Sequence, residues 1–294
     1  MVKTSASSRM GRDRTAELAA CGWRLIEQIQ PDGSVDYEKI PLTEAEFLHP
    51  QEGYRLPNST FHDDVIRTAA DILSRRYASD PTIGVFADLI VEWDIPNLKD
   101  HCPDVFVAFN LQHKDQNRGR FIVANEGTRP SLIIEVVSPR YRKADRTTKV
   151  AHYARAKVQE YVICDRRRYR GNLLEEVLGY RLVGNTYQPI TPDAAGRIRC
   201  DTVGVWISLC EGALIMEDVA TGQHLPTSLE LEASKRELET CNQELTASNQ
   251  ELTVSNQELT ASKRDLELSN QAMAAVLARY QARFGELPAN NGEA

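Results

Sequence analysis

The sequence contains no apolar run approaching the roughly 20 residues that a membrane-spanning helix needs, so we expect no membrane-spanning segment. Its first stretch, residues 1–14, is polar and basic and lacks the apolar core of a secretory signal. Hydrophobic residues make up 41% of the 294 residues and charged residues 26%. These ordinary fractions exclude a fibrous or wholly disordered chain and indicate a globular protein of one or two domains.

Cysteine pairs with redox or zinc-binding spacing are also missing. The six cysteines form no C-x-x-C pair, and no cysteine–histidine cluster has the spacing of a zinc site. Several of them lie in apolar, strand-like segments, where a free thiol behaves as a small hydrophobic side chain. We therefore expect reduced thiols and a cytoplasmic protein.

The chain has no net positive charge, since its formal charge is −7, but its charged side chains are unevenly distributed along the sequence. Residues 139–170 carry eleven basic side chains against three acidic ones, a local charge of +8. Such a segment can attract a polyanion although the whole chain is negative. The alternative is an ordinary solvated surface, so charge alone does not decide for nucleic acid.

Periodicity and capping residues predict helices in the N-terminal part. We expect a short helix within residues 15–30, and Thr43 with Glu46 matches a capping box at the start of another. Residues 58–60 offer N-caps for a longer helix over residues 61–77, whose apolar positions follow helical spacing.

β-branched and aromatic runs then predict a series of strands. The run over residues 132–137 is apolar throughout, as in a strand buried on both faces. It is followed by a helical segment over residues 145–156 and a second buried strand, a βαβ unit that implies parallel pairing. Residues 121–123 form a short strand or a loop. The expected strands cover residues 84–93, 105–109, 132–137, 161–164, 177–183, 186–190 and 203–209.

From Leu229 onward, leucine recurs at every seventh position, from Leu231 to Leu266, within repeats such as NQELTAS. A seven-residue period is typical of helices that supercoil around each other. In such a pair the leucines and the residues three positions before them face the partner helix. Most of these second positions are asparagine, and buried asparagine weakens the contact between the helices. We expect a coiled coil that makes the protein a homo-oligomer, against the alternative of a lone polar helix.

Two carboxylates lie inside or beside apolar strands, Asp104 in PDVFV and Glu135 in LIIEVV. A buried ionised carboxylate is unfavourable unless a cation or strong donors meet it. Two of them on adjacent strands would offer the oxygen ligands that Mg²⁺ prefers. Taken singly, each has an ordinary explanation, as a strand-edge residue or a strand-start cap.

A lysine on the following helix completes the candidate site. Asp145, Lys149 and Tyr153 are spaced to lie on one helical face, and the helix follows directly from the Glu135 strand. Lys149 could therefore reach the carboxylates. The alternative is an ordinary Asp145–Lys149 pair on a helix surface.

In order and residue type, these elements resemble the PD-(D/E)XK nuclease superfamily, and most closely its Uma-type branch of restriction-endonuclease-like proteins. The resemblance runs from about residue 42 to residue 209. One position departs from the usual superfamily pattern, because Val137 stands where a lysine is expected. In the Uma-type branch this lysine has moved to the next helix, which Lys149 matches. The residues that carry the resemblance are Pro103, Asp104, Glu135, Val136, Val137, Ser138, Pro139, Asp145, Lys149, Tyr153, Glu160, Tyr161 and Asp165.

The resemblance implies a restriction-endonuclease-like mixed β-sheet flanked by helices, and Mg²⁺- or Mn²⁺-dependent hydrolysis of DNA. Asp104, Glu135 and the backbone carbonyl of Val136 would hold the metal ion, with Lys149 as the third catalytic residue. Asp145, Tyr153 and His62 would support them. The residues expected to contact DNA phosphates are Arg140, Arg142, Lys143 and Arg146.

Two other functions remain open at this stage: a nuclease fold that binds nucleic acid without cleaving it, and a scaffold protein whose heptad segment carries the function. The expected organisation has four parts. These are a partly flexible N-terminal extension (1–40), a nuclease-like domain (41–226), a heptad-repeat coiled coil (227–284) and a flexible tail (285–294).

Overall fold

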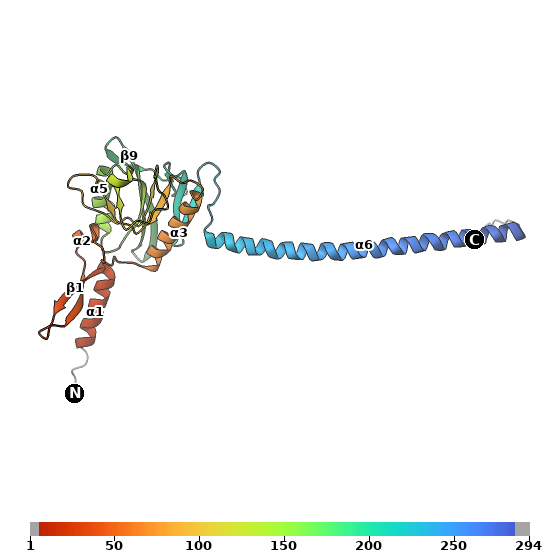
Figure 1. Ribbon diagram of the computed structural model, residues 1–294, viewed down its shortest axis with the longest axis horizontal. Helices are drawn as coiled ribbons and strands as arrows, with labels where there is room; N and C mark the ends of the chain where they lie inside the picture. The colour runs from red at the N-terminus through yellow and green to blue at the C-terminus, as the bar shows by residue number, and fades with distance from the viewer. Residues whose placement is uncertain (1–5, 286–294) are drawn as a thin grey trace, which may run out of the picture. The chain divides into compact units, whose positions relative to one another are not determined.

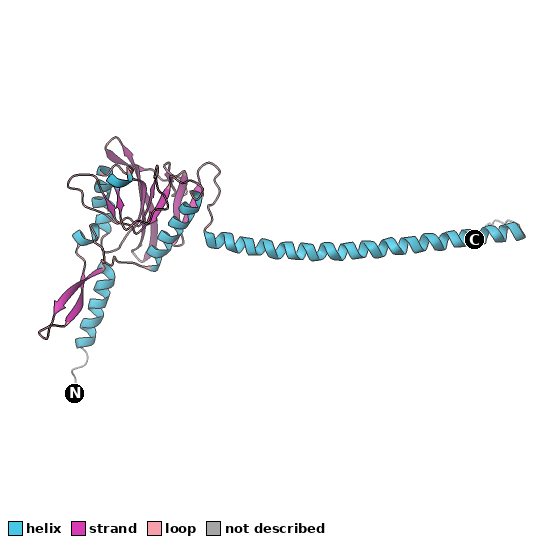
Figure 2. Ribbon diagram, in the orientation of Figure 1, coloured by secondary structure: helices cyan, strands magenta, loops and turns pink. Residues whose placement is uncertain are grey.

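The computed structural model of the protein describes residues 6–285, so the expected tail, apart from Gly285, lies outside the described residues. The chain forms two compact units, Met1–Ser228 and Leu229–Ala294. Within its described residues, the first unit combines strands with short helices, and the second is a single long helix (Figures 1 and 2). No helix within residues 6–285 is both long and apolar enough to cross a membrane.

The first unit is built around a six-stranded sheet with the order β10-β9-β8-β7-β5-β3. Only β7 and β8 are parallel among these neighbours, and a helical segment connects them as the sequence predicts. The expected mixed α/β fold is therefore confirmed. The strands are β3 (Gly84–Ala87), β5 (Val105–Ala108), β7 (Pro130–Val136), β8 (Glu160–Tyr169), β9 (Asn172–Val183) and β10 (Thr186–Ile190).

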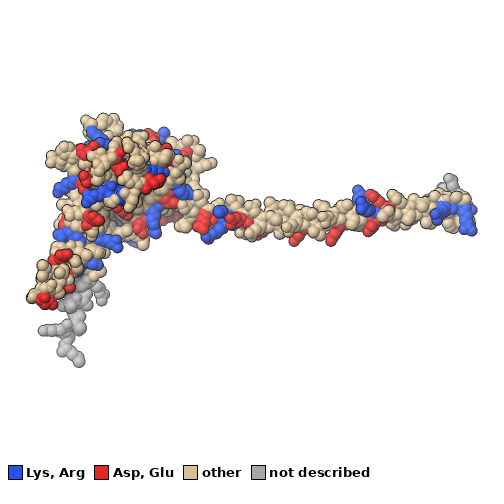
Figure 3. Space-filling model, in the orientation of Figure 1, with Lys and Arg blue, Asp and Glu red and all other residues tan. Residues whose placement is uncertain are grey.

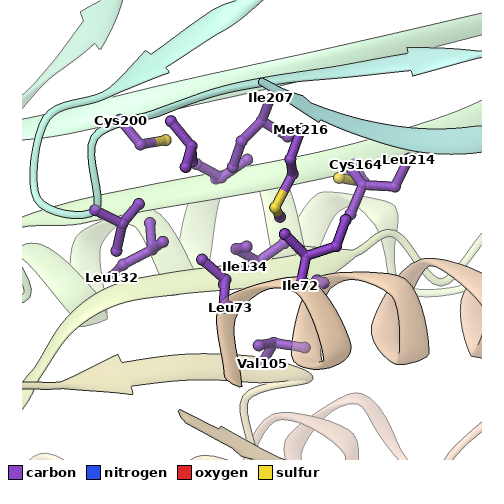
Figure 4. Packing of buried hydrophobic residues seen from close by; sticks show 14 of the residues in the cluster. Ile72, Leu73, Val105, Leu132, Ile134, Cys164, Cys200, Ile207, Leu214 and Met216 are labelled. Carbon is purple, nitrogen blue, oxygen red and sulfur yellow. The ribbon is translucent and has the colours of Figure 1, made fainter. Parts of the chain in front are cut away.

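One face of this sheet packs against helix α3 (Thr60–Arg76) and a second, antiparallel sheet. Leu132 and Ile134 of β7 point into this core, and Ile72 and Leu73 of α3 meet them there (Figure 4). The second sheet closes the core from the far side. Its strands are β11 (Ile198–Cys200), β12 (Val205–Cys210) and β13 (Ala213–Asp218).

The opposite face packs against helix α5 (Lys149–Arg155) and the loops around β4 (Val91–Glu92). Ile133 of β7 points into this second core, since successive strand residues face opposite sides. Having apolar contacts on both faces explains why the sequence of β7 does not alternate between apolar and polar residues.

Local capping sets where two helices begin, as expected. Thr43 and Glu46 form the predicted capping box at the start of α2 (Glu44–Leu48). The Ser59 side chain accepts from the backbone N–H of His62 at the start of α3. The cap places His62 in the first turn of α3, close to the end of the central sheet.

The helix expected within residues 15–30 is right only as far as Cys21 and wrong beyond it. The chain instead forms α1 (Ala6–Cys21) and then an antiparallel hairpin of β1 (Trp23–Ile29) and β2 (Val35–Pro41). Gly22 separates helix from strand with φ 73°, and a Cβ there would lie 2.3 Å from the Arg55 carbonyl oxygen. Only glycine fits this turn, which propensity alone did not locate.

Other predicted strand boundaries also differ from those in the structure. The expected strand over residues 84–93 is interrupted after β3, and its second part, β4, pairs in parallel with β6 (Phe121–Ile122). A short helix, α4 (Val123–Glu126), follows β6 directly. The last predicted strand corresponds to β12, but its neighbours β11 and β13 were not expected from the sequence.

The second unit is the C-terminal part of α6 (Ser228–Phe284), which is helical throughout. None of the residues of α6 is buried. The repeated leucines are all exposed, from 46% for Leu231 to 68% for Leu259. The helix expected from the heptad pattern is therefore present, while its association is not tested by a single chain.

Truncating a core side chain of β7 should destabilise the first unit. Ile134 is 1% exposed, so Ile134→Ala removes buried methyl groups and leaves a cavity that costs about 2–4 kcal/mol of unfolding free energy. Val183 at the end of β9 is 48% exposed, and Val183→Ala should stay within about 0.5 kcal/mol of wild type. Urea unfolding of both variants measures this. Equal losses would contradict the two-faced burial of β7.

Candidate functional site

The two strand carboxylates lie at one end of the central sheet. β5 and β7 are antiparallel with Val105 facing Ile134, and extending this register by one pair sets Asp104 opposite Glu135. Residues opposite each other on antiparallel strands project to the same face, with Cβ atoms about 5 Å apart. Both side chains are buried, at 6% and 1% exposure. The structure thus brings together the two acids that the sequence singled out.

Asp104 is held by a backbone amide and a histidine. The Val136 N–H donates to Asp104 Oδ2 at 2.6 Å, beyond the last pair of the β5–β7 ladder. His62 Nε2 lies 3.3 Å from the same oxygen. Burial raises the pKa of Asp104, but His62, Lys149 and the Val136 amide outweigh it and bring the pKa below its ordinary value. Asp104 is therefore ionised at neutral pH.

His62 and Asp88 stand beside Asp104. Burial lowers the pKa of His62, but the charge of Asp104 reverses this and raises the pKa overall. Asp88 follows β3 with a left-handed backbone (φ 50°), and its N–H donates to the Asp104 carbonyl at 3.2 Å. Burial and the charge of Asp104 raise the pKa of Asp88 to about 6. The site therefore has a third titratable carboxyl group, which the sequence did not assign to it.

Glu135 is held at both oxygens. Lys149 Nζ donates to Oε2 at 2.9 Å, and the Tyr153 hydroxyl donates to Oε1 at 2.6 Å. Burial, helped by the charges of Asp104 and Asp145, raises the pKa of Glu135 to about 8 although Lys149 opposes the shift. The acidic side chains of the site therefore outnumber the two cationic side chains that contact them, Lys149 and His62.

Lys149 is the only lysine among these groups, and it is 5% exposed. Its amine lies 3.0 Å from Asp145 Oδ1 and 5.0 Å from the centre of the Phe47 ring. Burial lowers the pKa of Lys149, but Asp145, Glu135 and Asp104 together raise it far above its ordinary value. The amine is therefore charged at neutral pH and offsets part of the negative charge of the site.

A π-helical turn precedes Lys149. Residues Ala144–Thr148 form this turn, and the Lys149 N–H bonds to the Ala144 carbonyl five residues back. The sequence predicts one α-helix here, and the wider turn is a correction to it. Single π-turns inside helices occur often at functional sites, and this one carries both Asp145 and the start of α5.

Asp145 fixes this turn to the sheet. Its Oδ2 accepts from the Ser138 N–H at 3.2 Å, and the Tyr161 hydroxyl of β8 donates to its carbonyl at 3.0 Å. Asp145 is fully buried. The predicted supporting residues Asp145, Tyr153 and His62 are thus all in contact with the predicted catalytic residues.

Asp104, Glu135 and Lys149 line a cleft of about 530 Å³, whereas Asp145 and Tyr153 are not part of its lining. Asp88, Asp104, Glu135, Val136 and Lys149 form its polar end. His62 and Ile66 of α3, Cys102, and Phe47 and Leu48 of α2 also line it. The remaining wall comes from segments that the sequence did not connect with the site: α1, the start of β1 and the loop between α2 and α3. These wall residues include Leu18, Ala19, Trp23, Tyr54, Arg55, Leu56 and Pro57.

The four basic residues expected to bind phosphate differ in their surroundings. Arg146 lies 2.7 Å from Asp165 of β8 and 2.6 Å from Glu176 of β9, and Arg142 also pairs with Asp165. Asp165 itself is fully buried. Arg140 and Lys143 are exposed. Arg142 and Arg146 are therefore already paired with acidic side chains of the fold.

A stack of three histidines lies behind Tyr153, and sequence reasoning missed it. The ligand atoms of His49, His101 and His152 lie within 4.8 Å of one another. Trp93 donates its indole N–H to His101 Nδ1 at 2.9 Å, so His101 carries its proton on Nε2 and donates to His152 Nδ1 at 2.9 Å. His101 Nε2 has no lone pair for a metal ion in this arrangement. Burial lowers the pKa of His101 and of His152, and this hydrogen-bonded pair packs beside Tyr153.

The donor set around Asp104 suits a hard divalent cation. Three carboxyl groups, Asp88, Asp104 and Glu135, line the same cleft, and burial together with the charge of Asp104 raises the pKa of both Asp88 and Glu135. Carboxylate oxygens are the ligands that Mg²⁺ and Mn²⁺ prefer. A cation at this end of the cleft would offset the charge that Lys149 and His62 leave unbalanced.

The mixed sheet with two buried acids and a lysine at one end defines a restriction-endonuclease-like domain. Residues 46–210 match the Uma2 family, whose description is "Putative restriction endonuclease". This match covers more than half of the chain, which therefore belongs to that family, and the resemblance stated from the sequence is confirmed.

Comparison with solved structures finds a crystal structure from Anabaena variabilis, titled as "a putative nuclease belonging to DUF820". It shares 15% sequence identity, covers 55% of this chain and 91% of its own, and superimposes with a TM-score of 0.38. Comparison with curated proteins finds no match.

The buried pair of His101 and His152 should make the free energy of unfolding fall in mild acid. Burial lowers the pKa of His101 well below its ordinary value, and the pKa of His152 is lowered too. Both histidines therefore bind protons more readily unfolded than folded, and unfolding free energy is lost as pH falls below the unfolded pKa of about 6.5. His101 contributes up to about 2 kcal/mol of this loss by pH 5.

The variant that tests this is His101→Gln, whose amide can still accept from Trp93 and donate to His152 but does not titrate. The melting temperature should fall less between pH 7 and pH 5 for His101→Gln than for wild type. The same fall in both proteins would contradict a buried neutral His101.

Proposed function

We propose that this protein is a Mg²⁺-dependent endonuclease that hydrolyses phosphodiester bonds in DNA. One observation carries the proposal: Asp104, Glu135 and Lys149, far apart in the sequence, line one end of a single cleft. Membership in the Uma2 family, described as "Putative restriction endonuclease", supports the same chemistry.

The metal ion would be held by the carboxylates of Asp104 and Glu135 and the backbone carbonyl of Val136. Bound there, Mg²⁺ or Mn²⁺ supplies a Lewis acid that polarises a phosphate oxygen and lowers the pKa of a bound water. Asp104 is kept ionised by His62 and the Val136 amide, so it can bind a cation without losing a proton. Both oxygens of Glu135 accept hydrogen bonds, from Lys149 and Tyr153, and a bound cation would offset the burial and the neighbouring negative charges that raise its pKa.

Lys149 would offset the negative charge that builds up on the phosphate as the bond to water forms. Its amine is already fixed between Glu135 and Asp145, so little reorganisation is needed during the reaction. Tyr153 holds the second oxygen of Glu135 and keeps that carboxylate turned toward the lysine. Both contacts pre-organise the site before substrate arrives.

Arg140 and Lys143 are the proposed contacts to DNA phosphates, because they are exposed on the segment between Glu135 and Lys149. Arg142 and Arg146 would contribute only a local field, since Asp165 and Glu176 balance part of their charge. Such contacts give affinity and salt dependence without reading a sequence.

A nucleic-acid-binding module without activity is favoured by Val137, which stands where the superfamily's lysine is expected. Against it, the amine of Lys149 reaches Glu135 at 2.9 Å from the next helix, so the missing charge is supplied from another position. A domain that only binds DNA has no need for a buried lysine among three acids, and we favour the nuclease.

Removing either metal-binding carboxylate should abolish cleavage. Asp104→Asn and Glu135→Gln keep the shape of the side chain but remove its charge, so we expect cleavage of supercoiled plasmid with Mg²⁺ to fall at least 10²-fold. The measurement is the rate of conversion to nicked and linear forms.

Glu92→Gln is the matched control, since Glu92 is an exposed acid outside the cleft. Circular dichroism of all three variants confirms that they fold. If Asp104→Asn and Glu135→Gln cleave at the same rate as Glu92→Gln, the proposed site is wrong. Lys149→Met completes the series and should lower the rate by a comparable factor.

Neutralising the exposed basic pair should weaken DNA binding without sequence preference. We compare Arg140→Ala/Lys143→Ala with wild type in the Glu135→Gln background, measuring affinity for duplex DNA over a range of salt concentrations. Losing two phosphate contacts should reduce the slope of log affinity against log salt by about 2. The double variant Arg279→Ala/Arg283→Ala on α6 should leave the slope unchanged. An unchanged slope for Arg140→Ala/Lys143→Ala would place the DNA contacts elsewhere.

A further inference from the structure

The exposed face of α6 has two regular rows of side chains. Leucines at every seventh position form one row, and the position three residues before each leucine forms the other. The second row is dominated by asparagine. In order along the helix it contains Lys235, Asn242, Asn249, Asn256, Lys263, Asn270, Leu277 and Phe284.

This helix has neither the strong helix-forming residues nor the packed apolar face that would stabilise a single helix of its length. Its repeats are rich in asparagine, serine and threonine, which are weaker helix formers than alanine or leucine. Most helical stability in proteins comes from packing of an apolar face, yet none of the residues of α6 is buried. The leucine row is therefore a face that requires a partner.

The partner that fits is a second copy of the same helix. In a parallel, in-register pair each row faces its own counterpart, so asparagine meets asparagine and leucine meets leucine. In an antiparallel pair each asparagine would face a leucine, and its buried amide would lack a hydrogen-bond partner. We propose that α6 forms a parallel, in-register, two-stranded coiled coil with a second copy of this chain.

The C-terminal end of α6 fixes the register. The repeats between residues 242 and 262 are nearly identical, so a slip by seven residues would preserve most of their layers. Beyond them, Met273, Leu277, Tyr280 and Phe284 continue the two rows with apolar side chains, all exposed in the single chain. Only the in-register pair matches each of these four residues with itself.

Within the two rows, charge occurs only at Lys235 and Lys263, whose long side chains can extend their amines out of the seam into water. The positions that flank the two rows in the central repeats are serine and threonine, and the central part of the helix shows few charged side chains on the face in Figure 3. Asparagine at these seam positions also favours two strands over larger bundles. Parallel pairing joins both copies of the first unit to the same end of the coiled coil.

Disulfide trapping distinguishes the two orientations in the full chain. The exposed Cys210 and Cys241 are first replaced by serine. Leu238→Cys lies in the leucine row far from the middle of α6, so mild oxidation should give nearly complete covalent dimer. Gln257→Cys on the outer face of the helix is the control and should give almost none.

Two equimolar mixtures complete the test. The first contains Leu238→Cys and Leu277→Cys chains, and the second contains Leu238→Cys and Asn270→Cys chains. Hetero-disulfides between the two kinds of chain, without Leu238 homodimer, would overturn the parallel orientation. Light scattering of the unmodified chain should give twice its 33.0 kDa. A mass of one or three chains at micromolar concentration would overturn the proposal.

Leu245→Lys/Leu252→Lys should convert the protein to a monomer, because both charges would fall in the seam. The matched variant Ala247→Lys/Val254→Lys adds the same charges on the outer face and should remain a dimer. Loss of the dimer in both variants, or in neither, would contradict the assigned seam.

Discussion

The ion pairs of Lys149 with Glu135 and Asp145 are the contacts on which the rest of the site depends. A buried lysine among three carboxylates is tolerable only because each of its neighbours needs a cation. The pairing places the start of α5 against the end of β7, and the π-turn at Ala144–Thr148 provides the backbone path for it. Removing the lysine would leave uncompensated charge in the core, so architecture and candidate chemistry are coupled at this residue.

The segments around this centre have separate tasks. α1, β1 and the loop before α3 wall the cleft and limit access to the carboxylates. On the other side, the histidine stack supports Tyr153, whose ring lies 5.2 Å from that of His101. Tyr153 in turn fixes Glu135. The position of the Glu135 carboxylate thus depends on groups outside the cleft lining.

Much of this could be predicted from the sequence because the signals are local. The apolar run of β7, the capping box at Thr43 and the heptad row of α6 each follow from spacing within a short window. The histidine stack and the place of Asp88 could not, because they depend on loops that meet only in three dimensions. Likewise, Arg142 and Arg146 appeared free in the sequence, since their partners Asp165 and Glu176 lie on later strands. The turn at Gly22 was missed for a related reason, as its requirement comes from the distant Arg55 carbonyl.

The central claim is that Asp104 and Glu135 together hold a divalent cation. Crystals soaked in Mn²⁺ and measured at the manganese absorption edge test it directly. The account predicts an anomalous peak within about 2.5 Å of a carboxylate oxygen of each residue. It also predicts that the peak disappears in Glu135→Gln. A fully occupied peak elsewhere in the protein, with none between Asp104 and Glu135, would contradict it.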